Sequence, residues 1–239
     1  MTAAQPPDRP PGPPPAPPPD DPEARGLRLG AVLLGLTVVS GLIDAVGYLG
    51  LGHVFTANMT GNVVVLGFAA AGAPGFSIRH TLTSLVCFLA GAAAGGRIAV
   101  RFGGGSRRTW ARLTLTAETV LVGTAAAVAF AEPDANGTTY ALIALTAFAM
   151  GLRNATVRKL HVADLTTTVL TMTLTGLASE SRLGGGDGRR SPRRAAAVAA
   201  MVAGALLGAW LVTHHDLAAP LLLAALAAGA LALVTSGRE

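Results

Sequence analysis

Long apolar stretches recur along this chain, and they constrain its fold more than any other feature. A helix needs roughly 20 mostly apolar residues to cross the hydrocarbon core of a bilayer. Backbone groups in lipid must find their hydrogen bonds within the chain, so each stretch is expected to be helical. The sequence therefore predicts an all-α, polytopic membrane helix bundle. Six stretches have the length of a full span: about 28–50, 81–101, 112–131, 138–157, 195–213 and 217–235.

Composition favours this class over soluble ones. Charged residues make up 13% of the chain, against roughly 25% in soluble domains. The net charge of +5 comes mostly from arginines in short loops beside the apolar stretches, as the positive-inside rule describes. Aromatic residues are too sparse to stack nucleic-acid bases, so we predict no nucleic-acid partner. The lone Cys87 excludes an internal disulfide and a cysteine-based zinc site. We predict neither a metal nor a cofactor.

The first 26 residues differ from the rest of the chain. Eleven of the fifteen prolines lie before Arg25, a composition that can form polyproline II but cannot build a core. We expect residues 1–26 to be a disordered tail, residues 27–131 a first membrane repeat and residues 132–239 a second. The tail is either a passive cytoplasmic segment or a docking peptide for a partner.

Two further apolar stretches, about 56–73 and 165–178, are shorter or more polar than a full span. If they enter the membrane and return, the clusters around Arg107, Arg153 and Arg190 all lie on the cytoplasmic side, and so do both termini. If both cross fully, the loop around Arg107 lies outside. We favour six full spans plus two short or broken helices, in a multi-pass protein of the bacterial plasma membrane.

The two halves share a sequence pattern. GLIDA at Gly41–Ala45 resembles GLRNA at Gly151–Ala155, and a GxxxG motif follows in each half. Small residues at this spacing allow helices to approach closely in lipid. Three spans in each half would place the two repeats in opposite orientations, and transporters with this plan bind solutes near the midplane. Chance similarity is the alternative, because glycine and alanine are abundant here.

Polar residues follow the first span and recur at the equivalent place in the second half. A helix that begins inside the membrane exposes unpaired N–H groups, which asparagine and threonine side chains can cap. Two such helix ends facing one cavity would favour an anion. Alternatively, the polar groups only satisfy the break in the helix. The residues concerned are Asn58, Thr60, Gly61 and Asn62 in the first half, and Thr166, Thr167, Thr168 and Thr171 in the second.

Asp44 is the most informative single residue, because a carboxylate within an apolar span is costly and often functional. The repeat aligns it with Asn154, next to Arg153. We expect Asp44 and Arg153 to approach each other, either as a proton- or cation-coupling pair or as a structural ion pair. Glu118 is either a second coupling group or an interfacial residue near Arg112. No nucleophile–base pair is evident, so we do not expect an enzyme.

The motifs resemble those of a known family. GLIDAVGYLGLGHVFTANMTGNVVVLG and AMGLRNATVRKLHVADLTTTVLTMTLTGLASE are similar to segments of the YoaK-like family of uncharacterised bacterial integral membrane proteins. The matching elements are Asp44, Ala57–Asn62, Met150–Ala155 and Thr166–Thr175. The resemblance implies an integral membrane protein with about six spans, and it implies no activity, substrate or cofactor.

Together these features favour a transporter or permease for a small anionic or zwitterionic solute, surrounded by membrane lipid. Its central polar site would be lined by Asp44, Asn58, Thr60, Gly61, Asn62, Arg153, Asn154, Thr166, Thr167, Thr168 and Thr171. The small size of the chain is compatible with a homodimer formed through the GxxxG faces. The alternative is a non-transporting scaffold or assembly factor that binds partners through the proline-rich tail.

Overall fold

The computed structural model describes residues 22–102, 107–133, 135, 137–160 and 170–234. The described part is helical, with one short 3-10 turn, η2, at Arg182–Gly184. This confirms the predicted all-α membrane bundle. The α-helices are α1 (Pro22–Gly50), α2 (Met59–Ala70), α3 (Ile78–Phe102), α4 (Arg107–Ala131), α5 (Thr138–Leu160), α6 (Leu170–Ser179), α7 (Ser191–His214) and α8 (Ala218–Val234).

Helix lengths follow the predicted division into long and short stretches. Within the described residues, five helices are long and apolar enough to cross a membrane, namely α1, α3, α4, α5 and α7. The helix at the sixth predicted span, α8, has 17 described residues. The two weak stretches form α2, with 12 residues, and α6, with 10. α1 begins at Pro22, so residues 22–26, which we assigned to the tail, are helical. Proline is favoured in the first turn of a helix, where its missing N–H would have no partner.

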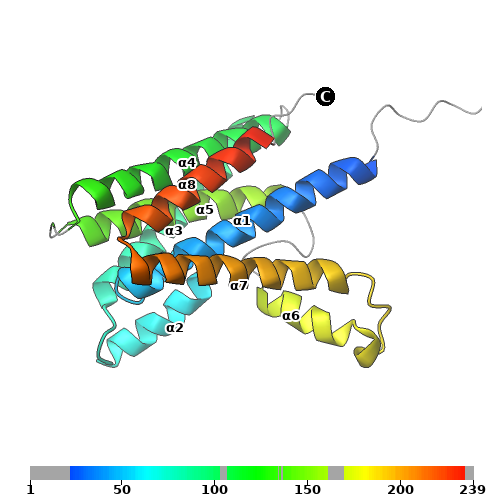
Figure 1. Cartoon of the computed structure of the whole chain (residues 1–239), viewed down its shortest axis with the longest axis horizontal. Coiled ribbons are helices and arrows are strands. Elements are labelled where there is room, and N and C mark those ends of the chain that lie inside the picture. The colour runs from blue at the N-terminus through cyan, green and yellow to red at the C-terminus, as the bar shows by residue number, and fades with distance from the viewer. Residues whose placement is uncertain (1–21, 103–106, 134, 136, 161–169, 235–239) are drawn as a thin grey trace, which may run out of the picture.

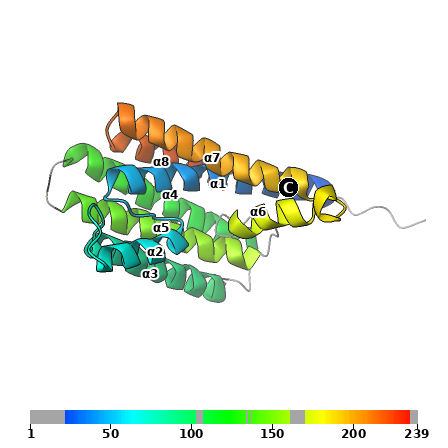
Figure 2. The same ribbon diagram turned by 90° about the horizontal axis from the view of Figure 1, so that it is seen from below.

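The six longer helices run broadly along the long axis of the molecule (Figures 1 and 2). They pack mainly as three pairs: α1 with α7, α3 with α5, and α4 with α8. Contacts of α4 with α5 and of α1 with α8 join the pairs into one bundle. α1 begins and α8 ends at the same end of this bundle (Figure 1).

Glycines show the direction of two of these pairs. Gly91 and Gly95 of α3 lie against the carbonyl oxygens of Phe148 and Leu152 on α5. Residue numbers rise together along the two helices, so α3 and α5 run parallel. At Gly91 an added Cβ would collide with the Phe148 carbonyl. The absence of a side chain is therefore what allows the two backbones to touch.

The pair formed by α1 and α7 is built in the same way. Gly204 and Gly208 of α7 lie against the carbonyl oxygens of Val38 and Leu42 on α1. The two helices therefore also run parallel. Between the two pairs, the contacting carbonyls on α5 lie 110 residues after those on α1, and the contacting glycines on α7 lie 113 residues after those on α3.

Two apolar clusters show that α1 and α5 run antiparallel. The smaller cluster contains Leu36 of α1 and Val157 of α5, while the larger contains Ile43 and Met150 of the same helices. Since α3 is parallel to α5, it is antiparallel to α1. The chain therefore leaves α1 and enters α3 at the same end of the bundle, with the short α2 in between.

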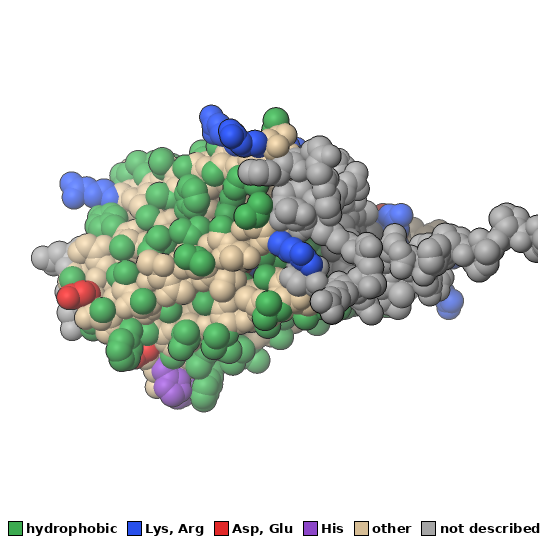
Figure 3. All heavy atoms as spheres, turned by 90° about the horizontal axis from the view of Figure 1, so that it is seen from above, with side chains coloured by type: hydrophobic (Ala, Val, Ile, Leu, Met, Phe, Trp, Pro, Cys, Tyr) green, Lys and Arg blue, Asp and Glu red, His purple; other side chains and the backbone are tan. Residues whose placement is uncertain are grey.

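The two short helices have corresponding places. α2 and α6 each begin near the middle of the molecule and then diverge toward opposite ends (Figures 1 and 2). Seen from above, hydrophobic side chains are spread across the face of the bundle, and most charged side chains lie toward its margins (Figure 3). Exposed leucines and valines, such as Leu89, Val100, Leu206 and Leu233, are expected on a surface that faces lipid.

Candidate functional site

A buried ion pair connects three helices inside the bundle. Arg153 of α5 and Glu118 of α4 lie 3.0 Å apart, from Nη1 to Oε1, and the two side chains are 1% and 0% exposed. Arg153 also donates to the Ser40 hydroxyl on α1 at 2.6 Å and to the Leu36 carbonyl at 3.3 Å. The Met150 sulfur lies 2.7 Å from Nη2. One guanidinium therefore holds α1, α4 and α5 together.

This polar layer lies between the two apolar clusters. Leu36 and Leu115 belong to the smaller cluster, and Val39 and Val122 to the larger. Glu118 stands between Leu115 and Val122 on α4, so apolar groups lie both before and after it along the helix. The layer is therefore an interior feature of the bundle. It does not lie at the membrane surface.

The ion pair leaves two polar atoms without a hydrogen bond. Oε2 of Glu118 and Nε of Arg153 are buried and have no partner among the described residues. A bidentate pair would have used both carboxylate oxygens. Unpaired buried polar atoms are costly. This ion pair therefore stabilises the fold less than a fully hydrogen-bonded pair would.

Asp44 lies one helical turn beyond Ser40 on α1, on the same face. Its side-chain oxygen Oδ1 accepts hydrogen bonds from the backbone amides of Thr56, at 2.9 Å, and Ala57, at 2.7 Å. Asp44 is 8% exposed. The described residues include no direct ion pair between Asp44 and Arg153, because Arg153 pairs with Glu118 and with Ser40, one turn before Asp44. Asp44 thus anchors the segment that leads into α2.

Asn62 closes the same segment from the other side. Its amide oxygen accepts from the Phe55 amide at 2.8 Å, and its amide nitrogen donates to the Phe55 carbonyl at 2.5 Å and to Ser84 of α3 at 3.0 Å. Ser84 itself donates to the Phe55 carbonyl at 2.6 Å. Asn62 is 0% exposed. These contacts are internal to the chain and make Asn62 an anchor for the loop.

Three neighbouring residues have different surroundings. Asn58 occupies the N-cap position of α2, but its side chain forms no capping hydrogen bond. This corrects the expected capping role, because Asp44 and Asn62 take most of the polar contacts of the preceding loop. Asn58 and Thr60 are exposed. Gly61 lies against the Phe55 ring, which an added Cβ would meet at 2.5 Å, so its role is to allow close packing.

In the second half, the structure describes only part of the predicted site. Thr166, Thr167 and Thr168 lie outside the described residues. Asn154, the counterpart of Asp44, is half-buried on α5, and Thr171 is exposed on α6. Arg194 of α7 holds α6 in place by donating to the Gly176 carbonyl at 2.8 Å and pairing with Glu180 at 2.9 Å.

The residue that sequence reasoning placed least well is Glu118. We considered an interfacial position near Arg112, whereas the structure buries Glu118 completely and pairs it with Arg153. Its spacing from Leu115 and Val122 already placed it on the apolar face of its helix. That spacing was the available signal.

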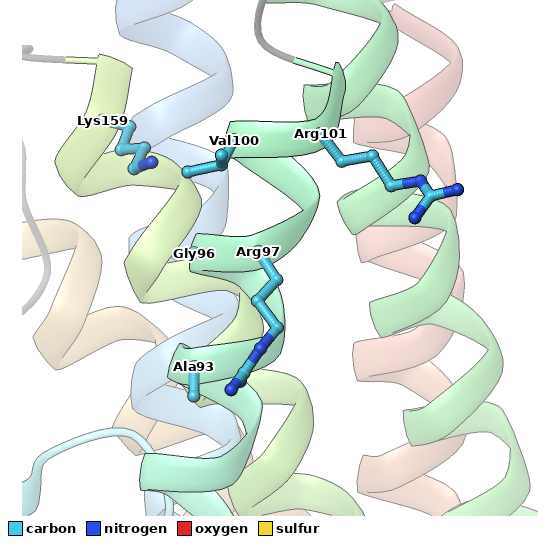
Figure 4. Close-up of a pocket in the computed structure, with 6 residues that line it drawn as sticks. All are labelled: Ala93, Gly96, Arg97, Val100, Arg101 and Lys159. Atoms are coloured by element: carbon cyan, nitrogen blue, oxygen red, sulfur yellow. The ribbon is translucent and has the colours of Figure 1, made fainter.

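A surface groove lies away from this layer, along α3 and near the end of α5. It is lined by Ala93, Gly96, Arg97, Val100, Arg101 and Lys159. Figure 4 shows the Arg97 side chain extending along α3, while Arg101 points toward α4. The three cations therefore do not converge on one point. Among the described residues, no group of three histidine, cysteine or acidic side chains is placed to hold a metal ion.

The comparisons with known proteins agree with a membrane protein. Residues 32–234 match the family described as "Protein of unknown function (DUF1275)". The chain is similar to the "UPF0700 transmembrane protein YoaK" of Bacillus subtilis (strain 168), with 35% identity over 149 residues. That match covers 61% of this chain and 64% of the relative, which is less than two thirds of the relative's length. No solved structure matches this chain.

Proposed function

The chain belongs to the DUF1275 family of integral membrane proteins, and from its buried charged layer we propose that it transports a small solute. The observation that carries this proposal is the position of Asp44, Glu118 and Arg153 inside an apolar helix bundle. Charged side chains within membrane spans are rare, face the bundle interior and mark ion or solute pathways. A purely structural protein of this size gains little from three buried charges, because a buried ion pair is a weak source of stability.

We further propose that the chain consists of two inverted repeats, α1 to α4 and α5 to α8. In support, Gly91 and Gly204 make equivalent contacts with Phe148 and Val38, and α1 and α5 run antiparallel. In each contact a helix of one half packs on a helix of the other half. The two halves therefore interlock, and a movement of one half requires these glycine contacts to slide or rock. Alternating access in inverted-repeat transporters uses such motions.

Orientation follows from the positions of the basic residues. Arg101, Arg158 and Lys159 lie near the ends of α3 and α5, and Arg189 precedes α7. The helix directions bring these positions to the end where α1 begins and α8 ends (Figure 1). The positive-inside rule assigns that end to the cytoplasm. Both short helices then return to the side from which they entered, giving six crossings.

The solute class follows from the groups at the start of α2. α2 begins near the middle of the molecule (Figure 1), and the N-terminal end of a helix carries a partial positive charge. Asn58 and Thr60 are exposed at this end and can donate hydrogen bonds. These groups together suit a small carboxylate or a zwitterion.

Uptake into liposomes tests the proposal. Purified protein is reconstituted, and the entry of labelled small carboxylates and amino acids is measured with and without the same solute inside. We expect saturable uptake for one of these classes, and we expect Asp44→Asn to abolish it. Glu132→Gln is the matched control, since Glu132 is exposed in the turn after α4 and should not matter. Absence of saturable uptake for both classes by a folded protein would refute the proposal.

A scaffold that binds partners through residues 1–26 is the competing function. The observation in its favour is the concentration of eleven prolines before Arg25. Deleting residues 1–21, which precede α1, separates the two functions. A transporter keeps its uptake after the deletion, whereas a scaffold loses its partner and shows no uptake in either form.

A further inference from the structure

The buried layer does not balance its own charge. Four charged residues are buried in the described part of the chain: Asp44, Glu118, Arg153 and Arg194. Arg194 pairs with Glu180 beside α6, so it does not belong to the layer. Two carboxylates and one guanidinium remain. If all three are ionised, the layer carries one net negative charge between two apolar clusters.

A net charge in such surroundings is strongly unfavourable. An uncompensated buried ion is strongly disfavoured, and a buried group responds by binding a proton or a counterion. Arg153 pairs with Glu118 and donates to Ser40, which lies one turn before Asp44 on α1, and no second cation forms a salt bridge with Asp44 or Glu118 among the described residues. The described part of the chain therefore does not supply the missing positive charge, and a bound proton or counterion can supply it.

We propose that the layer of Asp44, Arg153 and Glu118 binds one exchangeable proton, and that solute transport is linked to this proton. Glu118 has a free oxygen, Oε2, on which the proton can reside while Oε1 stays with Arg153. Asp44 accepts two backbone amides on Oδ1, and its other carboxylate oxygen is the second candidate position for the proton. The proton comes from water and returns to it, so no other reactant is needed.

The way in for the proton lies next to Asp44. Asp44 is 8% exposed, whereas Arg153 and Glu118 are 1% and 0% exposed. The segment from Thr56 to Ala57, which Asp44 holds, leads directly into α2. A proton that enters there meets Asp44 first and Glu118 last. Neutralising the layer also removes the net negative charge that would repel an anionic solute, and this is the physical link between proton and solute.

Infrared spectroscopy of the protein in liposomes tests the proton directly, because a protonated carboxyl group has its own carbonyl stretching band. At neutral pH we expect the wild-type protein to show a band equivalent to one buried carboxyl group. Glu118→Gln and Asp44→Asn each leave one carboxylate for Arg153, so the band should disappear in both. Arg153→Gln removes the fixed cation, so the band should double. Glu132→Gln is the control and should leave the band unchanged.

Other outcomes overturn the proton. A wild-type spectrum without this band refutes it, as does a band that persists in both Glu118→Gln and Asp44→Asn. If the band appears only when sodium and potassium are removed, a metal cation balances the layer and the proton assignment is wrong. The wild-type spectrum and the two carboxylate variants decide the question even if Arg153→Gln does not fold.

The link to transport rests on the proposed function, and its failure can be told apart from the failure of the proton. If the band behaves as expected but no solute is taken up, the bound proton is supported and the proposed transport function fails. If uptake persists without the band and does not respond to a pH gradient across the liposome, the transport function is supported and its linkage to a proton is refuted.

Discussion

Gly204 of α7 lies directly against the backbone carbonyl of Val38 on α1, and a Cβ at this position would collide with that oxygen. This contact joins the helix at the start of the described chain to one near its end. Helices in lipid gain no hydrophobic energy from contact with each other, so close backbone packing has to hold such pairs together. Gly91 makes the equivalent contact with Phe148.

Two glycines on α3 provide a matched test of this packing. Gly91→Ala should lower the unfolding temperature in detergent, because the new methyl group meets the Phe148 carbonyl. Forced overpacking of this kind costs about 1–3 kcal/mol. Gly96→Ala on the same helix meets nothing within 4 Å. It should be neutral or stabilising by up to about 1 kcal/mol, since alanine favours helix more than glycine does. Equal effects of the two substitutions would contradict the close contact.

The pair of Arg153 and Glu118 is tested by a double-mutant cycle. Arg153→Gln leaves Glu118 buried without its cation and should reduce stability by about 3–5 kcal/mol. Adding Glu118→Gln should recover a substantial part of this loss, because two neutral amides can bond to each other. Unfolding of the three variants and the wild type in a denaturant series measures the coupling energy. Additive effects would show that the two side chains do not interact.

The pH dependence of the single variant gives a second reading of the same pair. In Arg153→Gln both carboxyl groups must bind protons to stay buried, whereas in the unfolded chain they ionise freely. The folded state then binds more protons than the unfolded state, so stability should fall as pH rises. In the double variant only Asp44 contributes this term, and the slope should be smaller. A flat profile for Arg153→Gln would mean that the layer is open to water.

Asp44 has a structural role that can be separated from its charge. Asp44→Ala removes the acceptor for the Thr56 and Ala57 amides, so hydrogen exchange at these two amides should accelerate. Asp44→Asn keeps an acceptor oxygen and should retain most of the protection, although hydrogen bonds to a neutral group are weaker. If both variants lose solute uptake while amide hydrogen exchange accelerates only in Asp44→Ala, the charge of Asp44 is itself required for transport. Uptake that survives in Asp44→Asn would leave Asp44 as an anchor.

The apolar stretches predicted the helices well because the length of a span and its composition are local properties of the sequence. The two weak stretches were also distinguished correctly as short helices, α2 and α6. The partners of charged residues could not be predicted in the same way. Glu118 and Arg153 are separated by 35 residues, and which helix faces which depends on packing. The repeat aligned Asp44 with Asn154, but Arg153, the cation next to Asn154, pairs with Glu118 of α4.

The capping prediction was wrong for a related reason. Asn58 has the residue type of an N-cap and stands in the right place, yet its side chain makes no cap. Asp44, twelve residues before Thr56, supplies the acceptor for the loop instead. A local sequence pattern cannot anticipate a side chain that arrives from the preceding helix. Asn62 was predicted as a lining residue, and in the structure it forms hydrogen bonds with Phe55 and Ser84.

Thiol labelling in intact cells tests the proposed six crossings. Cys87 is first replaced by alanine, and single cysteines are placed at five exposed positions: Pro74, Glu132, Asp216, Arg182 and Arg189. The helix directions put the first three at one end of the bundle and the last two at the other. With the basic end in the cytoplasm, an impermeant reagent should label positions 74, 132 and 216 from outside. Positions 182 and 189 should react only after the cells are opened.

The pattern of labelling also distinguishes the repeats from their alternative. If α2 and α6 both crossed the membrane completely, positions 74 and 132 would lie on the same side as 182 and 189, opposite to position 216. At 12 residues, α2 is about 18 Å long at 1.5 Å per residue, against roughly 30 Å of hydrocarbon. We therefore expect positions 74 and 132 to label from outside together with position 216. Labelling of position 216 with protection of positions 74 and 132 would remove the inverted orientation of the two halves, and with it the argument that their broken helices meet at the midplane.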